Sequence, residues 1–158
     1  MHKKIEDVIN KVLKDDARKN ALEFVEHLQV NGVTFPESDN NFWDVDYSEK
    51  RLFTINIEIN DDDGTASFDT FVWFLPDAWE NSCASTPERT KEILWANVRP
   101  CEITGCGKCS PGISKNLFGK EFSNLCKNFL GIYDPDAETF AFMKEIFDGI
   151  KNDISEAY

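Results

Sequence analysis

Apolar residues recur at intervals of three and four over the first thirty residues. This spacing places them along one side of a helix and therefore predicts a helical N-terminal region. Asp15-Asp16 interrupts the pattern and indicates the start of a second helix, and Asn31-Gly32 indicates its end. The repeating apolar positions are Ile5, Val8, Ile9, Val12, Leu13, Ala17, Ala21, Leu22, Phe24, Val25 and Leu28.

The apolar period then changes to two, which is typical of β-strands with one solvent-facing side. Apolar and polar residues alternate over 43–47 and again over 53–59. Residues 67–75 form a third predicted strand, and 60–65, where Asn and Asp precede a Gly, form the hairpin that joins it to the second. The pattern predicts a three-stranded antiparallel meander.

Two further helices are predicted in the C-terminal half. Thr86-Pro87-Glu88 and Asp134-Pro135-Asp136 each combine a capping side chain with a proline and an acid, which is typical of helix starts. The second helix has a wide apolar face formed by Ala137, Phe140, Ala141, Met143, Ile146, Phe147 and Ile150. The predicted fold class is therefore α+β, with N-terminal helices, a three-stranded antiparallel meander, and C-terminal helices with a cysteine-rich loop.

Length and composition add limits to this outline. A chain of 158 residues is expected to form a single α+β domain over 1–158, with the cysteine loop at 100–127. Its 13 Phe and 4 Trp exclude a disordered chain. No apolar run reaches the roughly 18 residues of a membrane span, and the charged start lacks the apolar core of a signal peptide. We expect a soluble, cytoplasmic protein.

The charge is strongly acidic but unevenly distributed. With 17 basic and 29 acidic residues the net charge is −12, which disfavours nucleic acid and anionic membranes as partners. From Arg89 to Lys127, however, seven residues are basic and three are acidic. Solvated lysines explain this segment most simply. The alternative is that its cations stabilise thiolates, the form of cysteine that binds metal.

Four cysteines have a spacing that fits a metal site. Cys106 and Cys109 form a Cys-x2-Cys turn with glycines within and beside it, Cys101 precedes this turn by a short loop, and Cys126 follows downstream. Four thiolates arranged as a tetrahedron form a structural zinc site. We therefore predict zinc bound by Cys101, Cys106, Cys109 and Cys126, and regard Cys83 as a spare thiol.

The same cysteines allow other chemistry. Cys-x4-Cys-x2-Cys followed by a later Cys is also the spacing of plant-type ferredoxins, so a [2Fe–2S] cluster is an alternative cofactor. Cys106 and Cys109 could form a redox pair, although the βαβ context of thioredoxin-like motifs is missing. Metal-free cysteines and disulfides remain open, but an intracellular chain would keep the thiols reduced.

No catalytic residues are predicted. The chain has no Gly-x-Ser-x-Gly, P-loop or dinucleotide motif, and its two histidines, His2 and His27, have no nucleophile nearby in sequence. The strands could instead support a ligand pocket between the sheet and its covering helices, although core packing is the simpler role for the tryptophans. The residues predicted for this pocket are Trp43, Trp73, Glu58, Asn56 and Asp69.

Residues 95–150 resemble a group of small bacterial proteins of unknown function. The resemblance is carried by Trp-Ala-Asn-Val at 95–98, Cys-Gly-Lys-Cys-Ser-Pro-Gly at 106–112, the segment from Phe-Gly-Lys-Glu-Phe to Cys at 118–126, and Asp-Pro-Asp-Ala-Glu at 134–138. It implies a recurring cysteine-bearing module without an established activity. Such proteins look similar to ones found beside, or fused to, effector-sensing transcriptional regulators, which points weakly towards sensing.

These observations together favour a non-enzymatic domain with a structural zinc site that binds a small molecule or a protein partner. A [2Fe–2S] electron-transfer protein or a thiol-redox protein is the alternative.

Overall fold

A computed structural model describes residues 3–81, 86–101 and 112–157. Within these ranges the chain forms five helices and seven strands, so the α+β prediction is confirmed. The helices are α1 (Ile5–Val12), α2 (Asp15–Val30), α3 (Asp77–Asn81), α4 (Glu88–Ala96) and α5 (Ala137–Glu156). The strands are β1 (Glu37–Asp39), β2 (Phe42–Tyr47), β3 (Lys50–Ile59), β4 (Ala66–Val72), β5 (Val98–Pro100), β6 (Ile113–Leu117) and β7 (Lys120–Tyr133).

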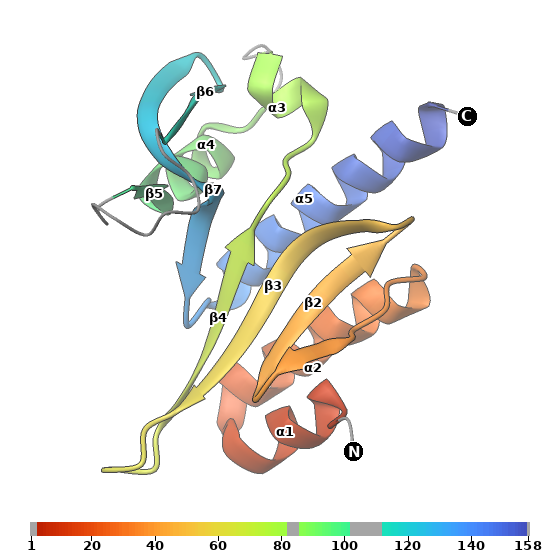
Figure 1. Cartoon of the computed structure of the whole chain (residues 1–158), viewed down its shortest axis with the longest axis vertical. Helices are drawn as coiled ribbons and strands as arrows, with labels where there is room; N and C mark the ends of the chain where they lie inside the picture. The colour runs from red at the N-terminus through yellow and green to blue at the C-terminus, as the bar shows by residue number, and fades with distance from the viewer. Residues whose placement is uncertain (1–2, 82–85, 102–111, 158) are drawn as a thin grey trace.

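All the strands belong to one antiparallel sheet in the order β1-β2-β3-β4-β7-β5, and β6 also pairs with β7 (Figure 1). The 14-residue β7 links two parts of this sheet. Its last residues pair with β4, in the register Asp69 opposite Tyr133, and its first residues pair with β6. β7 therefore connects the β1–β4 part of the sheet to the corner that contains β5 and β6.

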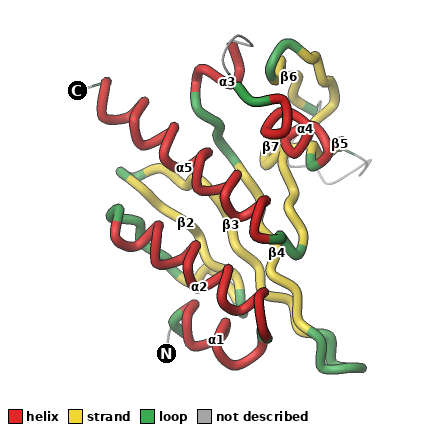
Figure 2. Tube along the Cα trace, turned by 180° about the vertical axis from the view of Figure 1, so that it is seen from behind, coloured by secondary structure: helices red, strands yellow, loops and turns green. Residues whose placement is uncertain are grey.

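Helices α1, α2 and α5 cover one face of the sheet (Figure 2). Alternate residues of β3 point towards them, because side chains along a strand alternate between the two faces. Phe53 is fully buried, and its ring lies 6.4 Å from that of Phe24 in α2, which in turn lies 5.5 Å from Phe140 in α5. The apolar core thus lies between this face and the helices.

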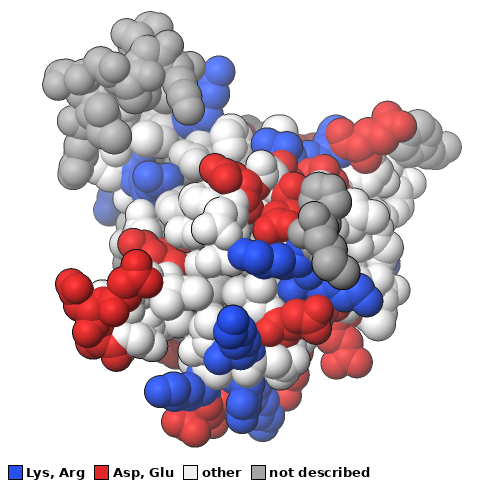
Figure 3. Space-filling view, turned by 60° about the horizontal axis from the view of Figure 1, so that its bottom comes forward, with Lys and Arg blue, Asp and Glu red and all other residues white. Residues whose placement is uncertain are grey.

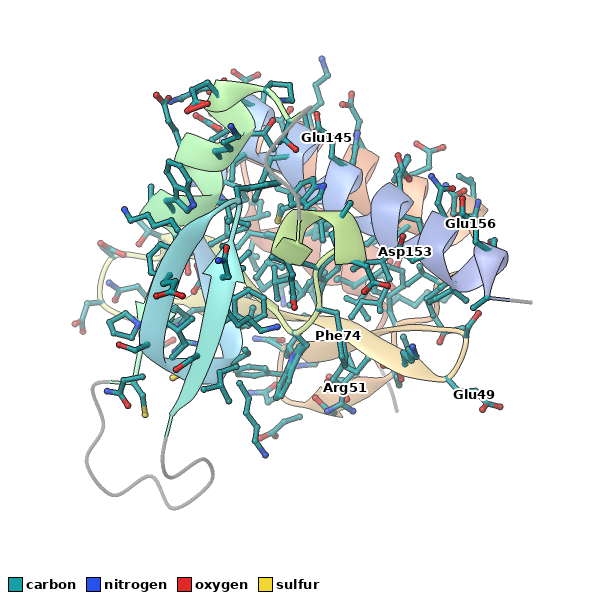
Figure 4. The ribbon with its side chains drawn as sticks, turned by 90° about the horizontal axis from the view of Figure 1, so that it is seen from above. Glu49, Arg51, Phe74, Glu145, Asp153 and Glu156 are labelled. Atoms are coloured by element: carbon teal, nitrogen blue, oxygen red, sulfur yellow. The ribbon has the colours of Figure 1, made fainter. Side chains whose placement is uncertain are left out.

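The opposite face of β2, β3 and β4 has no helix over it in the part of the chain that the structure describes (Figures 1 and 2). The intervening residues of β3, among them Thr54 and Asn56, point to this side. Viewed from above, Arg51 lies on the side of the sheet away from α5, the helix that carries Glu145 (Figure 4). We call this surface the helix-free face.

The strand count differs from the three that were predicted. Residues 100–127, expected to form the cysteine loop, include the end of β5, all of β6 and the first part of β7. Their periodicity is broken because Phe118 and Asn124 have positive φ values of 50° and 55°, and the β6–β7 register shifts between Ile113 and Lys115. None of the described helices has the length and apolar character needed to cross a membrane.

Candidate functional site

Asn124 binds the backbone of Cys101, the residue at which the segment with the Cys-x2-Cys motif begins. It lies within β7 in the left-handed conformation, at a β-bulge, an irregularity that often occurs beside functional sites. The Cys101 N–H donates to the Asn124 carbonyl at 2.6 Å, and Asn124 Nδ2 donates to the Cys101 carbonyl at 3.1 Å. Asn124 thus fixes the backbone of Cys101 from both its main chain and its side chain.

Gly112, at the other end of that segment, also lies against Asn124. A Cβ atom on Gly112 would lie 2.6 Å from Asn124 Oδ1 and 2.8 Å from its backbone, so only glycine allows this approach. Residues 101 and 112 therefore meet at a single residue of β7. We call Cys101, Gly112, Asn124 and Cys126 the cysteine corner.

The structure brings two of the four predicted zinc ligands to this corner. Pro100 of β5 pairs with Leu125 of β7, so Cys101 and Cys126 follow the two members of one antiparallel pair. Such diagonal neighbours have Cα atoms about 7–8 Å apart. Cys126 Sγ lies 3.9 Å from the Pro100 carbonyl oxygen, and both cysteines are partly exposed.

The other two predicted ligands, Cys106 and Cys109, lie outside the described residues, as does Cys83. Within the described ranges no three His, Cys, Asp or Glu side chains lie where they could share a metal ion. Because half of the predicted ligand set falls outside those ranges, the zinc site stays a prediction.

Four of the five residues predicted for a pocket lie on the helix-free face. Asn56 is directly opposite Asp69 in the β3–β4 register, and Glu58 is opposite Ser67, so these side chains share one face. Trp73 joins them, because its indole N–H donates to the Thr54 hydroxyl at 3.0 Å.

Trp43, the fifth residue, lies on the other face. It is fully buried in the core, and its indole N–H donates to the Lys3 carbonyl at 3.2 Å. The pocket was predicted between the sheet and its helices, but that space is filled by core side chains. The polar residues of the prediction thus lie on the opposite side of the sheet from Trp43.

Asp69 is the most unusual group on the helix-free face. Only 5% of the residue is exposed, although no helix covers it. The Ser67 hydroxyl donates to Asp69 Oδ2 at 3.2 Å, but Oδ1 is buried without a hydrogen-bond partner among the described residues. Burial raises the pKa of the Asp69 carboxyl. The hydrogen bond from Ser67 and the backbone N–H of Asp134 lower it, while the carboxylates of Asp134 and Glu58 raise it further.

A hollow of about 570 Å³ lies at the turn end of the β3–β4 hairpin, and Ser67, but not Asp69, lines it. Its wall includes the Ser67 hydroxyl that bonds Asp69, and it ends in an acidic tip of the hairpin, at the left of Figure 3. Apolar surface comes from Ile59, which is 40% exposed. The acidic residues of the wall are Glu58, Asp61 and Asp134.

Beyond Asp69 the same face becomes cationic. The Arg99 guanidinium lies 4.7 Å from the centre of the Phe71 ring, and Phe71 meets Tyr133 edge-on at 5.9 Å. Gly131 makes room for this arrangement, because a Cβ there would lie 2.4 Å from Arg99 Cδ. Arg99 Nη1 donates to Asn128 Oδ1 at 3.1 Å, and none of the ion pairs found in residues 3–81, 86–101 and 112–157 includes Arg99.

A buried carboxylate elsewhere on this face is paired. Asp44 of β2 forms an ion pair with Arg51 of β3. Burial raises the pKa of Asp44 and Arg51 opposes that shift. Asp44 and Arg51 thus form a structural pair, whereas no ion pair among the described residues includes Asp69.

The sequence did not single out Asn124, Arg99 or Tyr133. Asn124 resembles any polar strand residue until its φ is known, and Arg99 reaches Phe71 only through the β5–β7–β4 pairing. The position of Tyr133, directly before Asp-Pro-Asp, could have marked it as the end of a strand. His27 lies far from this face, where its Nε2 is 2.9 Å from Asp148 between α2 and α5.

Comparisons with protein-family models, with curated proteins and with solved structures gave no match to this chain. The resemblance of residues 95–150 to small bacterial proteins therefore stays a prediction, and functional inference depends on the geometry described above.

Proposed function

We propose that the chain is a non-enzymatic, cytoplasmic binding domain with one structural zinc ion. The ligands of this ion would be Cys101, Cys106, Cys109 and Cys126. The metal would hold the cysteine corner, and the helix-free face would take a small molecule or a protein partner.

The observation that carries the zinc proposal is the meeting of Cys101 and Cys126 beside Asn124. Structural zinc takes four thiolates in a tetrahedron. Here β5 and β7 would supply two of them, and the Cys-x2-Cys turn between residues 101 and 112 would supply the others.

Such an ion would contribute directly to folding. Structural zinc sites in small peptides have apparent binding energies of about 10–16 kcal/mol, which count as folding energy. The cysteine corner lies where β5 and β6 pair with β7, and both pairings have a shifted register. A metal bound there would cross-link β7 to the segment that follows β5 and so stabilise this irregular part of the sheet.

Metal analysis of the purified full-length protein tests the proposal. We expect a colourless protein with one zinc per chain, and loss of most of that zinc in Cys101→Ser and in Cys126→Ser. Cys83→Ser is the matched control and should keep the metal. Zinc that is absent from the wild type, or unchanged in Cys126→Ser, would overturn the proposal.

The same preparation separates the alternatives, which use the same thiols. A brown protein with visible absorption and bound iron would favour a [2Fe–2S] cluster over zinc. Metal-free protein with rapid alkylation of Cys106 or Cys109 would favour thiol-redox chemistry.

A further inference from the structure

The Arg99 side chain lies across three strands of the sheet, from β5 over β7 to β4. Its stem passes over Gly131 of β7, and its guanidinium lies 4.7 Å from the centre of the Phe71 ring in β4. Nη1 also donates a hydrogen bond to Asn128 Oδ1 at 3.1 Å. The aromatic ring and the neutral amide orient the guanidinium without neutralising its charge.

This charge has no carboxylate partner in the part of the chain that the structure describes. Arg51 and Arg89 each form an ion pair there, but Arg99 forms none. Arg18 also lacks an ion pair in the same part of the chain, but it is exposed to solvent, whereas Arg99 is half-buried. A charge that is partly removed from water is normally paired, because its desolvation costs free energy. An anionic ligand would supply the missing partner.

A hollow of about 340 Å³ lies beside this arginine. Arg99 and Tyr133 both line it, and Val98 and Pro100 add apolar surface. Ligand pockets usually enclose roughly 300–1,000 Å³, so this hollow has the size expected for a small ligand. A molecule bound in it would contact both the arginine and the tyrosine.

Tyr133 gives the hollow an aromatic wall. The residue is 59% exposed, and its ring meets the Phe71 ring edge-on at 5.9 Å. That contact orients the tyrosine ring and leaves more than half of the residue open to a ligand. Aromatic side chains favour contact with other rings, and the planar fork of arginine matches the two oxygens of a carboxylate.

We infer that this hollow binds a small aromatic carboxylate. The Arg99 guanidinium donates hydrogen bonds to the carboxylate, and the ligand ring lies against Tyr133. This assignment rests on the proposed function in one respect, since it names a ligand class for the helix-free face. Cys126, a proposed zinc ligand, also lines the hollow, but Arg99 and Tyr133 lie outside the proposed zinc ligand set.

Calorimetric titration of the full-length protein with benzoate tests the role of the arginine. We expect saturable binding by the wild type, and a loss of about tenfold or more in Arg99→Gln, because charge-assisted hydrogen bonds are removed. Arg99→Lys, which keeps the charge but lacks the fork, should also bind more weakly. Failure of the wild type to bind benzoate, or equal binding by Arg99→Gln, would overturn the inference.

Arg18→Gln is the matched control for net charge. Arg18 is exposed in α2 and does not line the hollow, so its substitution should leave the affinity for benzoate nearly unchanged. An equal loss in Arg18→Gln and Arg99→Gln would show non-specific attraction of an anion and contradict the site.

Three further probes test the chemistry of the ligand. Benzamide has the same ring without the charge and should not bind, whereas acetate has the carboxylate without the ring and should bind more weakly than benzoate. Tyr133→Ala should weaken the binding of benzoate more than that of acetate. Acetate or inorganic phosphate that binds as tightly as benzoate would overturn the assignment of an aromatic carboxylate.

Zinc content, measured on the same samples, separates this inference from the proposed metal site. A wild type that lacks zinc but binds benzoate through Arg99 would support the inference and overturn only the zinc proposal. A wild type that contains zinc but does not bind benzoate would overturn the inference and leave the zinc proposal standing.

Discussion

The two faces of the sheet differ in the kind of side chain that they bury. On the face towards the helices, Phe53, Ile55 and Ile57 are almost completely buried, and the one polar atom of the Trp43 side chain has a hydrogen-bond partner. On the helix-free face, a buried carboxylate oxygen of Asp69 lacks one among the described residues, and so does the Thr70 hydroxyl, which lies opposite Ile55 on the face towards the helices. The first face is almost entirely apolar, whereas the second contains a buried carboxyl group, which costs more to bury than a hydroxyl. Groups that lower stability are typical of sites kept for binding.

The largest expected effect comes from breaking the apolar face. Phe53→Ala should lower the free energy of unfolding by about 3–5 kcal/mol, because it leaves a cavity where the ring contacts Phe24. Phe74→Ala is the control, since Phe74 is 48% exposed, and it should cost about 1 kcal/mol or less. Urea denaturation measures both, and equal losses would contradict the assignment of the core.

On the helix-free face, Arg99 packs closely over Gly131. Gly131→Ala should cost about 1–3 kcal/mol, because the new Cβ collides with the Arg99 side chain that stacks on Phe71. In an Arg99→Ala background the same change should cost much less, since the obstacle is gone. A double-mutant cycle by thermal unfolding checks this, and additive effects would mean that Arg99 is not seated over Gly131.

The next prediction concerns the N-terminal cap of α5, one of the helices that cover the apolar face. Asp136 accepts hydrogen bonds from the Thr139 N–H at 2.8 Å and from its hydroxyl at 2.7 Å. Asp136→Ala should therefore cost about 0.5–2 kcal/mol at pH 7, whereas Asp136→Ser, which keeps a cap, should cost less.

The pH dependence of this cap follows from the same hydrogen bonds. They lower the pKa of Asp136, so its contribution is complete above the ordinary value of 3.8 and is lost as the pH falls below it. An unchanged difference between wild type and Asp136→Ala at pH 3 would contradict this account.

The smallest effect should have the opposite sign. The pKa of Asp69 is raised by burial, so the native state binds its proton more tightly than the unfolded chain. Its cost is absent below the ordinary value of 3.8 and appears as the pH rises through the raised value. Asp69→Asn should therefore stabilise the protein at pH 7, by about 1 kcal/mol, with the gain vanishing near pH 3. Destabilisation at pH 7 would mean that Asp69 has a structural partner.

Periodicity was sufficient for the parts of the fold where one face is uniformly apolar. The alternation over 53–59 predicted β3, and the spacing from Phe140 to Ile150 predicted α5. It failed for β7 because the first part of that strand is mostly exposed, and because Asn124 inserts a left-handed residue that breaks the alternation. A bulge adds one residue to a strand, so a strict alternation of apolar and polar residues does not reveal it.

The candidate sites were predictable to different extents. The sequence grouped Asn56 and Asp69 in one predicted pocket, and they do lie opposite each other, but it assigned that pocket to the side of the sheet that the helices cover. The spacing of the cysteines placed Cys101 and Cys126 in one predicted set of four zinc ligands, but the approach of these two depends on the register between β5 and β7, which links residues far apart in the chain. Pairing between strands that are far apart in the chain depends on tertiary contacts, so the sequence around each strand does not reveal it.

The attachment of residues 101 and 112 to Asn124 has an evolutionary consequence. Cys101 and Gly112 are both held by one residue of β7, so insertions or deletions between these two positions need not shift the register of β5 or β6. Related chains are therefore expected to vary most in length and content between these two positions while retaining the asparagine and the glycine. The same sheet could then carry different sequences between these two positions.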